Sequence, residues 1–255
     1  TLWFNTKGEK KNKMLTFKNH YFGNGSFLAR SLSFEDNKLF KVTHLDMPTQ
    51  DNEKNILSLV EKELSSGSYL ALWLEPILQK TMDKTPLSFI KEIKKICLKY
   101  NVKLVFNETA SSMFRFSDNY FASEIKEITP DAGFCYLSGQ AGVCFMNKED
   151  FVEKPLMLIS TWDGDEFTFA NYNRVLQKVT SDTDAYKKLQ QDFQTKLEQV
   201  LNDYHVEEIN LENGCGYFVG NIPTNLSSMF ELRDGRYIVM ASRDSMIEFI
   251  NSKSI

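Results

Sequence analysis

The sequence has few cysteines and histidines, and those present are scattered. The four cysteines, at positions 97, 135, 144 and 215, form no C-x-x-C pair, and the three histidines do not cluster. Protein metal sites usually combine such residues at short, regular spacings. The sequence therefore predicts no metal site. Isolated free thiols in apolar segments are typical of a reducing compartment, so we expect the protein in the cytoplasm.

The chain also lacks any apolar run long enough to cross a bilayer. It opens on Thr1-Leu2-Trp3 rather than on the charged and then apolar start of a signal peptide. Its formal net charge of −4 gives no reason to expect nucleic acid or an anionic membrane as a partner. Among possible partners, these observations leave proteins and small molecules.

What the chain does contain is an ordinary globular composition with a clear strand–helix–strand unit. Of its 255 residues, 42% are hydrophobic and 25% are charged. Residues 69–74 and 102–106 are continuous apolar runs, typical of strands buried on both faces. Between them, Thr85-Pro86 is read as a capping hydroxyl followed by proline at the first helical position, and residues 87–100 carry one apolar stripe.

This unit predicts a mostly parallel sheet, in which functional groups collect at the carboxyl ends of the strands. Glu75, Asn107 and Glu108 are expected along that rim. Glu75 and Glu108 invite an acid–base hypothesis, but both belong to strand ends that the fold itself explains, so we expect a structural role.

Further along the chain, the pattern predicts two core strands over residues 132–137 and 142–146. Helices are expected over 166–180 and from a capping Asp182 to Tyr204. Short strands and a closing helix over 244–251 follow. We therefore expect a large α/β domain over residues 1–204 and a small α+β lobe over residues 205–255.

Six short segments occur in the order and spacing of one family of cofactor enzymes. They are an apolar strand leading into His20-Tyr21-Phe22-Gly23, the strand end Leu74-Glu75-Pro76, the run Asn107-Glu108-Thr109 with a later Arg115, the triplet Thr129-Pro130-Asp131, the strand over 142–146, and Ser160-Thr161-Trp162-Asp163-Gly164. Together they resemble the class III (ornithine/4-aminobutyrate-type) aminotransferases, which use pyridoxal phosphate (PLP). The resemblance implies an aspartate aminotransferase-like fold: a mostly parallel central sheet flanked by helices, plus the small C-terminal lobe.

The departures from the family pattern concern the residues that the chemistry needs most. The family's lysine, which forms a Schiff base with PLP and carries protons, has no counterpart, because no lysine lies between Lys126 and Lys148. Asn107 stands where the family has an aspartate that keeps the pyridine nitrogen protonated. Phe22 replaces a histidine, and the family's N-terminal phosphate-binding turn is not present. We therefore assign no catalytic residue and expect a degenerate, N-terminally short relative.

Some of a cofactor pocket is expected to remain, as a vestigial site. The resemblance implies cofactor-binding positions at Tyr21, Asn107, Thr109 and Thr161, with Tyr21 stacking on a flat ring and Thr161 offering a hydroxyl to a phosphate across a dimer interface. The alternatives are ordinary packing for Tyr21 and a bond to nearby backbone for Thr161.

Three functions are compatible with this pattern. The first is an aminotransferase-like protein that has lost PLP catalysis, binds no cofactor, and acts as a binding or assembly module. Its expected partner is a second copy, an aminotransferase-fold paralogue or adjoining domains. The second is a PLP-dependent aminotransferase whose missing site parts come from upstream sequence or a partner subunit. The third is a pocket re-used for another phosphorylated or aromatic small molecule. Whether the protein is an enzyme stays open at this point.

Overall fold

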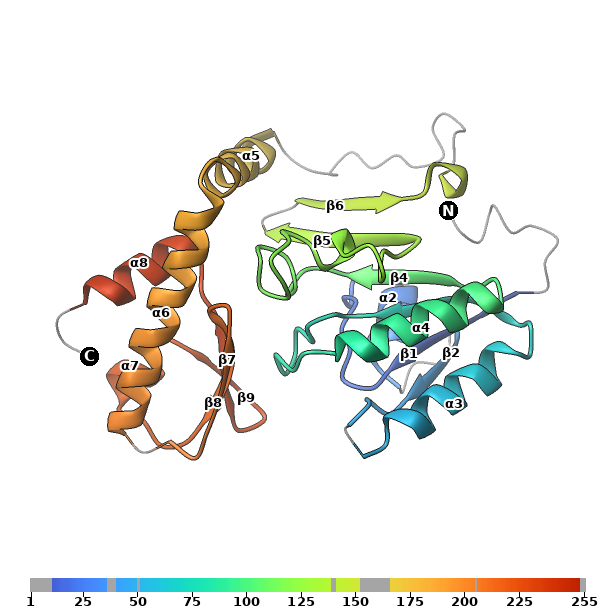
Figure 1. Ribbon diagram of the computed structural model, residues 1–255, viewed down its shortest axis with the longest axis horizontal. Coiled ribbons are helices and arrows are strands. Elements are labelled where there is room, and N and C mark those ends of the chain that lie inside the picture. Colours follow the sequence, from blue (N-terminus) through green and yellow to red (C-terminus); the bar gives the residue numbers. More distant parts are fainter. Residues whose placement is uncertain are drawn as a thin grey trace.

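The computed structural model describes residues 11–35, 40–49, 51–138, 141–151, 166–204 and 206–252. Two β-sheets lie side by side in the molecule, each with its own helices (Figure 1). The first sheet has six strands and contains the predicted strand–helix–strand unit. The second has four strands and belongs to the C-terminal part of the chain.

The six-stranded sheet has the order β2-β1-β3-β4-β5-β6. Its strands are β1 (Lys13–Phe17), β2 (Lys41–Leu45), β3 (Tyr69–Leu74), β4 (Lys103–Asn107), β5 (Ala132–Ser138) and β6 (Ala141–Met146). All neighbouring pairs are parallel except β5 and β6, which form an antiparallel pair at one edge. The expected α/β fold with a mostly parallel central sheet is therefore confirmed.

One face of this sheet is covered by two amphipathic helices, α3 (Glu53–Leu64) and α4 (Leu87–Lys99). Alternate strand residues, such as Leu104 and Phe106 of β4, point into the core beneath these helices, while Val105 points to the opposite face. The short helix α2 (Phe27–Ser33) contributes Leu28 to that opposite face. Because both faces of every central strand are apolar, these strands have the continuous hydrophobic runs seen in the sequence.

The start of α4 differs from the prediction. Pro86 occupies the position before the helix and makes no side-chain cap. The Thr85 hydroxyl instead donates a hydrogen bond to the backbone carbonyl of Glu75, at 2.8 Å. Thr85 was expected to cap the helix, but its hydroxyl is buried beside the end of β3 and bonds there, so it ties the helix entrance to the strand end.

The second sheet is antiparallel, in the order β7-β8-β10-β9. Its strands are β7 (Glu208–Glu212), β8 (Cys215–Val219), β9 (Glu231–Arg233) and β10 (Arg236–Met240), and the short helix α7 (Thr224–Ser227) and the closing helix α8 (Arg243–Asn251) accompany them. The turn between β7 and β8 has Asn213 and Gly214 at φ of 51° and 71°, as a tight hairpin requires. Gly216 follows at φ 142°, where an added Cβ would lie 1.9 Å from the Asn210 carbonyl oxygen.

Two helices precede this sheet, α5 (Glu166–Ser181) and α6 (Thr183–Asp203), and both were expected. Asp182 caps α6 as predicted, since its carboxylate accepts a hydrogen bond from the Ala185 amide at 3.0 Å. The sequence pattern places α6 in the larger domain, yet its buried face, including Phe193 and Leu197, shares a core with Phe218 and Phe249 of the C-terminal lobe. The domain boundary at residues 204 and 205 stays a prediction.

The sequence predicts neither a membrane-spanning helix nor a metal site, and the described residues can be compared with both expectations. None of the described helices combines the length and apolar character needed to cross a bilayer. Within the same residues, no group of three or more histidine, cysteine or acidic side chains is arranged to hold a metal ion. The cysteines at positions 97, 135, 144 and 215 are all free.

Two short 3-10 turns complete the larger lobe, Ala122–Glu124 after β4 and Lys148–Asp150 after β6. The first of them lies beside the buried Glu108 carboxylate, which accepts hydrogen bonds from the Ala122 and Ser123 amides. The long connection after β4 is therefore anchored to the strand end from which it leaves.

Candidate functional site

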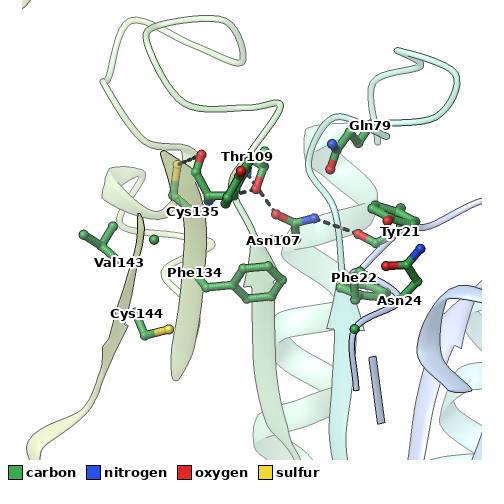
Figure 2. A pocket seen from close by; sticks show the side chains of 14 residues that line it. Tyr21, Phe22, Asn24, Gln79, Asn107, Thr109, Phe134, Cys135, Val143 and Cys144 are labelled. Carbon is green, nitrogen blue, oxygen red and sulfur yellow. Dashed lines mark hydrogen bonds between the residues drawn. The ribbon is translucent and has the colours of Figure 1, made fainter. Parts of the chain in front are cut away.

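A pocket of about 570 Å³ opens at the carboxyl ends of β4 and β5 (Figure 2). The chain segment that follows β1 closes one side of this pocket, and the β5–β6 hairpin closes the other. The described residues that line it are Tyr21, Phe22, Gly23, Asn24, Gly25, Gln79, Asn107, Thr109, Phe134, Cys135, Tyr136, Gly142, Val143 and Cys144. Three of the four predicted cofactor-binding positions thus lie in one pocket, whereas Thr161 lies outside the described residues.

Asn107, the last residue of β4, is fixed by hydrogen bonds on both ends of its amide. The side-chain nitrogen donates to the Tyr21 carbonyl at 2.7 Å and to a Glu75 carboxylate oxygen at 2.9 Å. Its side-chain oxygen accepts from the Thr109 amide at 3.0 Å. Only 2% of the residue is exposed. Asn107 therefore joins the ends of β3 and β4 to the segment after β1, and both of its donors are in use.

Glu75 lies at the centre of this network and is completely buried. Its carboxylate accepts from the Tyr21 amide at 2.7 Å and from the Gln79 amide at 3.4 Å, in addition to Asn107. Burial raises the pKa of Glu75 well above its usual value, while the donated hydrogen bonds and Lys80 act in the opposite direction. A second carboxylate at position 107 would face Glu75 at hydrogen-bond distance, so the amide of Asn107 suits this environment and an aspartate does not.

His20 completes the network from the side of β1. The Glu75 amide donates to His20 Nδ1 at 2.9 Å, which places the ring proton on Nε2, 3.0 Å from the Met47 sulfur. Burial lowers the pKa of His20 to about 3, so the ring is neutral. In the sequence, His20 stands apart from the other two histidines, although it begins one of the six family-like segments. Its position next to Tyr21 is the one signal that points to the site.

Thr109 and Glu108 leave the end of β4 in different directions. Thr109 lines the pocket, and its hydroxyl accepts a hydrogen bond from the Tyr136 amide at 3.1 Å. Glu108 is fully buried and accepts from Ser111, Ala122 and Ser123, and burial raises its pKa. Neither Glu75 nor Glu108 lines the pocket, and each carboxylate has its own donors. This geometry favours the structural role over the acid–base pair.

Tyr21 lines the pocket and is half-buried. Its ring is nearly perpendicular to that of Phe34, with the centroids 6.5 Å apart, and the Lys80 ammonium lies 5.7 Å from the Tyr21 ring centroid. The Lys80 ammonium also donates to the Ser33 carbonyl at 3.1 Å and lies 4.7 Å from the Phe34 ring. Lys80 is thus the amine beside Tyr21, and it is not among the residues that line the pocket.

Known proteins provide the comparison for this geometry. No family model matches the chain. Over 142 residues the chain is 30% identical to the adenosylmethionine-8-amino-7-oxononanoate aminotransferase of Buchnera aphidicola subsp. Schizaphis graminum, in a match that covers 49% of this chain and 32% of the relative. The match therefore spans about a third of that relative's length.

Two solved structures extend the likeness to almost the whole chain. The adenosylmethionine-8-amino-7-oxononanoate aminotransferase of Methanocaldococcus jannaschii has a TM-score of 0.75 and 15% identity, covering 98% of this chain and 68% of that one. The ornithine aminotransferase of Toxoplasma gondii has a TM-score of 0.72 and 16% identity, covering 98% of this chain and 66% of its own. The predicted resemblance to the class III aminotransferases is confirmed.

The class III aminotransferase fold implies PLP, and the pocket can be tested against that cofactor. PLP needs an amine for its aldehyde, cationic or amide donors for its phosphate, and a carboxylate for its ring nitrogen. The described residues that line the pocket include no lysine, arginine, histidine, aspartate or glutamate. Asn107, which the resemblance aligns with the family's aspartate, already donates both of its amide hydrogens within the protein. The described part of this pocket does not fit PLP.

Proposed function

We propose that this protein is a class III aminotransferase-like protein that carries out no PLP catalysis by itself and acts as a binding or assembly module, in the cytoplasm. The observation that carries the proposal is that the described residues lining the strand-end pocket include no charged side chain. A pocket without an amine has no group to condense with an aldehyde. A pocket without a carboxylate has no group that keeps a pyridine nitrogen protonated.

The opposite face of the large sheet supports the assembly part of the proposal. A groove of about 240 Å³ crosses this face and is lined by apolar residues from α2 and from five of the strands, including Leu28, Leu70, Trp73, Val105 and Met146. The Trp73 indole Nε1 is buried there and makes no hydrogen bond to a described group. Buried indole N–H groups normally have an acceptor. Within the described part of the chain, this groove is therefore open, and one of its polar groups lacks a partner.

The occupant that we propose for the groove is an apolar helix of a polypeptide with the aminotransferase fold. The solved relatives match 98% of this chain but only 66% and 68% of their own length, so about a third of their fold lies outside the match. Parallel sheets are covered on both faces. A second polypeptide that supplies the remaining cover, with an acceptor for Trp73, fits this surface. The partner is then a paralogue, a second copy or an adjoining domain.

Addition of PLP to the purified protein tests the proposal against the enzymatic alternative. We expect no yellow aldimine absorption after one equivalent of PLP, and no lysine adduct after borohydride reduction and peptide mass mapping. A stoichiometric adduct would show that an amine reaches the cofactor, and it would establish the second function, in which upstream sequence or a partner completes the site. The same titration on the protein purified with its partners extends the test to a shared site.

A further inference from the structure

A second pocket, of about 600 Å³, lies between α5, the start of α8 and the loop that contains Met113 and Arg115. It shares no lining residue with the pocket at the strand ends. Its lining contains four cationic side chains, Arg115, Arg174, Lys178 and Arg243, and one acidic side chain, Asp244. The whole chain has a net charge of −4. A concentration of positive charge in one pocket of an acidic protein requires an explanation.

The two cationic side chains of α5 lie close enough to repel each other. Arg174 and Lys178 are four residues apart on the helix, so their side chains are neighbours on one face, together with Asn171. Like charges at this spacing destabilise a helix. Neither side chain forms an ion pair with a described residue. Asp244 offers little compensation, because it pairs with Arg243 at 3.3 Å.

Arg115 forms the floor of the pocket and is only 8% exposed. A guanidinium has five N–H donors, but this one reaches only the Ser112 carbonyl at 3.4 Å and the Met113 sulfur at 3.8 Å. No carboxylate of the described chain pairs with it. A buried cation without an anionic partner is costly, and proteins normally neutralise it with a counter-charge.

The loop that holds Arg115 is itself fixed. Gln190 of α6 donates to the Met113 carbonyl at 3.0 Å, and Asn213 donates to the Arg115 carbonyl at 3.2 Å. These two bonds hold the backbone of the loop, and hence the Cα of Arg115, beside the pocket. The weak hydrogen bonds of the Arg115 guanidinium reflect a missing partner rather than a free surface position.

A second buried group near this pocket also lacks a partner. The Tyr186 hydroxyl is buried and makes no hydrogen bond to a described group. Burial raises the pKa of Tyr186, while the charges of Arg115 and Arg243 lower it, which places the hydroxyl within the field of both guanidinium groups. Tyr186 is not among the residues that line the pocket, so its hydroxyl is not counted among the groups that would contact a ligand.

We propose that this pocket binds a small oxyanion, either a carboxylate or a phosphate, between Arg115, Arg243 and the Arg174–Lys178 face of α5. An oxyanion would satisfy the buried guanidinium and remove the repulsion on α5. Arginine forks recognise carboxylate and phosphate groups by paired hydrogen bonds. The site is independent of PLP catalysis, so it stands whether or not the strand-end pocket takes a cofactor.

Thermal denaturation with inorganic phosphate and, separately, with succinate tests the site, with potassium chloride at matched ionic strength as reference. We expect one of the two anions to raise the melting temperature in a saturable way at millimolar concentration, and the more effective one identifies the class. The double variant Arg174→Gln/Lys178→Gln should weaken that anion at least tenfold. Lys188→Gln, an exposed position on α6, should leave its binding unchanged.

Two outcomes would overturn the proposal. One is a shift that chloride reproduces at the same ionic strength, because the effect would then be general screening. The other is an equal, saturable shift in the protein and in the double variant, because the anion would then bind elsewhere. Both α5 positions lie on a helix surface, so the double variant is expected to fold, and circular dichroism checks this directly.

Discussion

The two pockets differ in how their polar groups are used. Around the strand-end pocket, Glu75, Asn107 and His20 are buried, and each is engaged by hydrogen bonds within the chain. In the pocket beside α5, Arg115 is buried with only two long contacts, and Arg174 and Lys178 have no ion-pair partner among the described residues. Buried polar groups normally have partners, so the buried guanidinium of Arg115, with two long contacts, is the group that calls for a ligand.

The family resemblance and the unpaired charges therefore point to different pockets. The family likeness points to the strand-end pocket, where Asn107, which the resemblance aligns with the ring-pairing residue, bonds within the chain. The pocket beside α5 combines residues that are not all part of the family pattern, and its charge indicates a ligand. The predictions that follow test whether the first network is structural and the second pocket is functional, from the largest expected effect to the smallest.

Removing the centre of the satisfied network should have the largest effect. In Glu75→Ala, the Tyr21 amide and one Asn107 donor lose their buried acceptor. We expect the free energy of unfolding to fall by about 3 kcal/mol, since two unsatisfied buried donors add to a small cavity. Urea denaturation measures this, with Glu248→Ala at an exposed position of α8 as control. A loss below about 0.5 kcal/mol would show that the network has no structural role.

Restoring the family's residue should also destabilise the protein. In Asn107→Asp, a second carboxylate faces Glu75, and the Tyr21 carbonyl loses its donor. Burial and the neighbouring charge raise the pKa of such a pair, so its stability is present at low pH and lost as pH rises. We expect a loss of about 2 kcal/mol at pH 8 and a smaller one at pH 5.

Urea denaturation of Asn107→Asp at both pH values tests this, with the exposed Asn173→Asp on α5 as matched control. If Asn107→Asp were as stable as the parent at pH 8, the amide would not be required by its surroundings. The absence of the family's aspartate would then have no structural explanation, and loss of function alone would account for it.

His20 should make the network sensitive to acid. Burial lowers the pKa of His20 from 6.5 to about 3, so its stabilising contribution is present above pH 6.5 and is lost as pH falls toward 3. Below pH 6 the free energy of unfolding should fall by about 1.4 kcal/mol per pH unit through this residue. Glu75 and Glu108, whose pKa values are raised, act with the opposite sign.

Comparison with His20→Gln isolates this histidine, because Gln can still accept a hydrogen bond from the Glu75 amide while the two glutamates remain in both proteins. The difference in stability between the two should shrink as the pH is lowered from 7 to 5. A constant difference over that range would mean that the pKa of His20 is the same in the folded and the unfolded protein, as for an exposed ring.

The groove on the opposite face of the large sheet gives the assembly prediction. A charge introduced by Met146→Glu lies at its rim and should weaken association at least tenfold, about 1.4 kcal/mol, because a carboxylate would be buried against an apolar helix. Light scattering over a concentration series measures the association. Leu98→Glu, at a 64% exposed position of α4, is the control. Equal effects of both substitutions would place the interface elsewhere.

Much of the fold follows from local sequence. The continuous apolar runs of β3 and β4, the stripe of α4 and the cap of α6 at Asp182 each depend on residues near one another in the chain. These features also place Asn107 at the rim of the sheet. Local sequence does not contain the bond from Asn107 to the Tyr21 carbonyl, which joins positions 86 residues apart. Only the assembled sheet brings these two groups together.

The same limit explains what the sequence missed. Thr85 bonds to the Glu75 carbonyl rather than to the helix, because the strand end is nearby only in three dimensions. α6 has an apolar stripe that fits either sheet, and packing against Phe218 and Phe249 decides between them. The like-charged pair Arg174 and Lys178 is visible in the sequence, but the burial of Arg115 beside it is not.

The smallest predicted effect distinguishes a ligand site from a merely charged surface. Without added anion, Arg174→Gln/Lys178→Gln should raise the free energy of unfolding by about 0.3 kcal/mol, because it removes a like-charge pair at helical spacing. With the favoured anion present, the parent protein should become the more stable of the two. This reversal distinguishes anion binding from charge repulsion. Repulsion alone would leave the variant more stable than the parent both with and without the anion. If the variant is less stable in both, Arg174 and Lys178 have structural partners, and α5 needs them for its own packing.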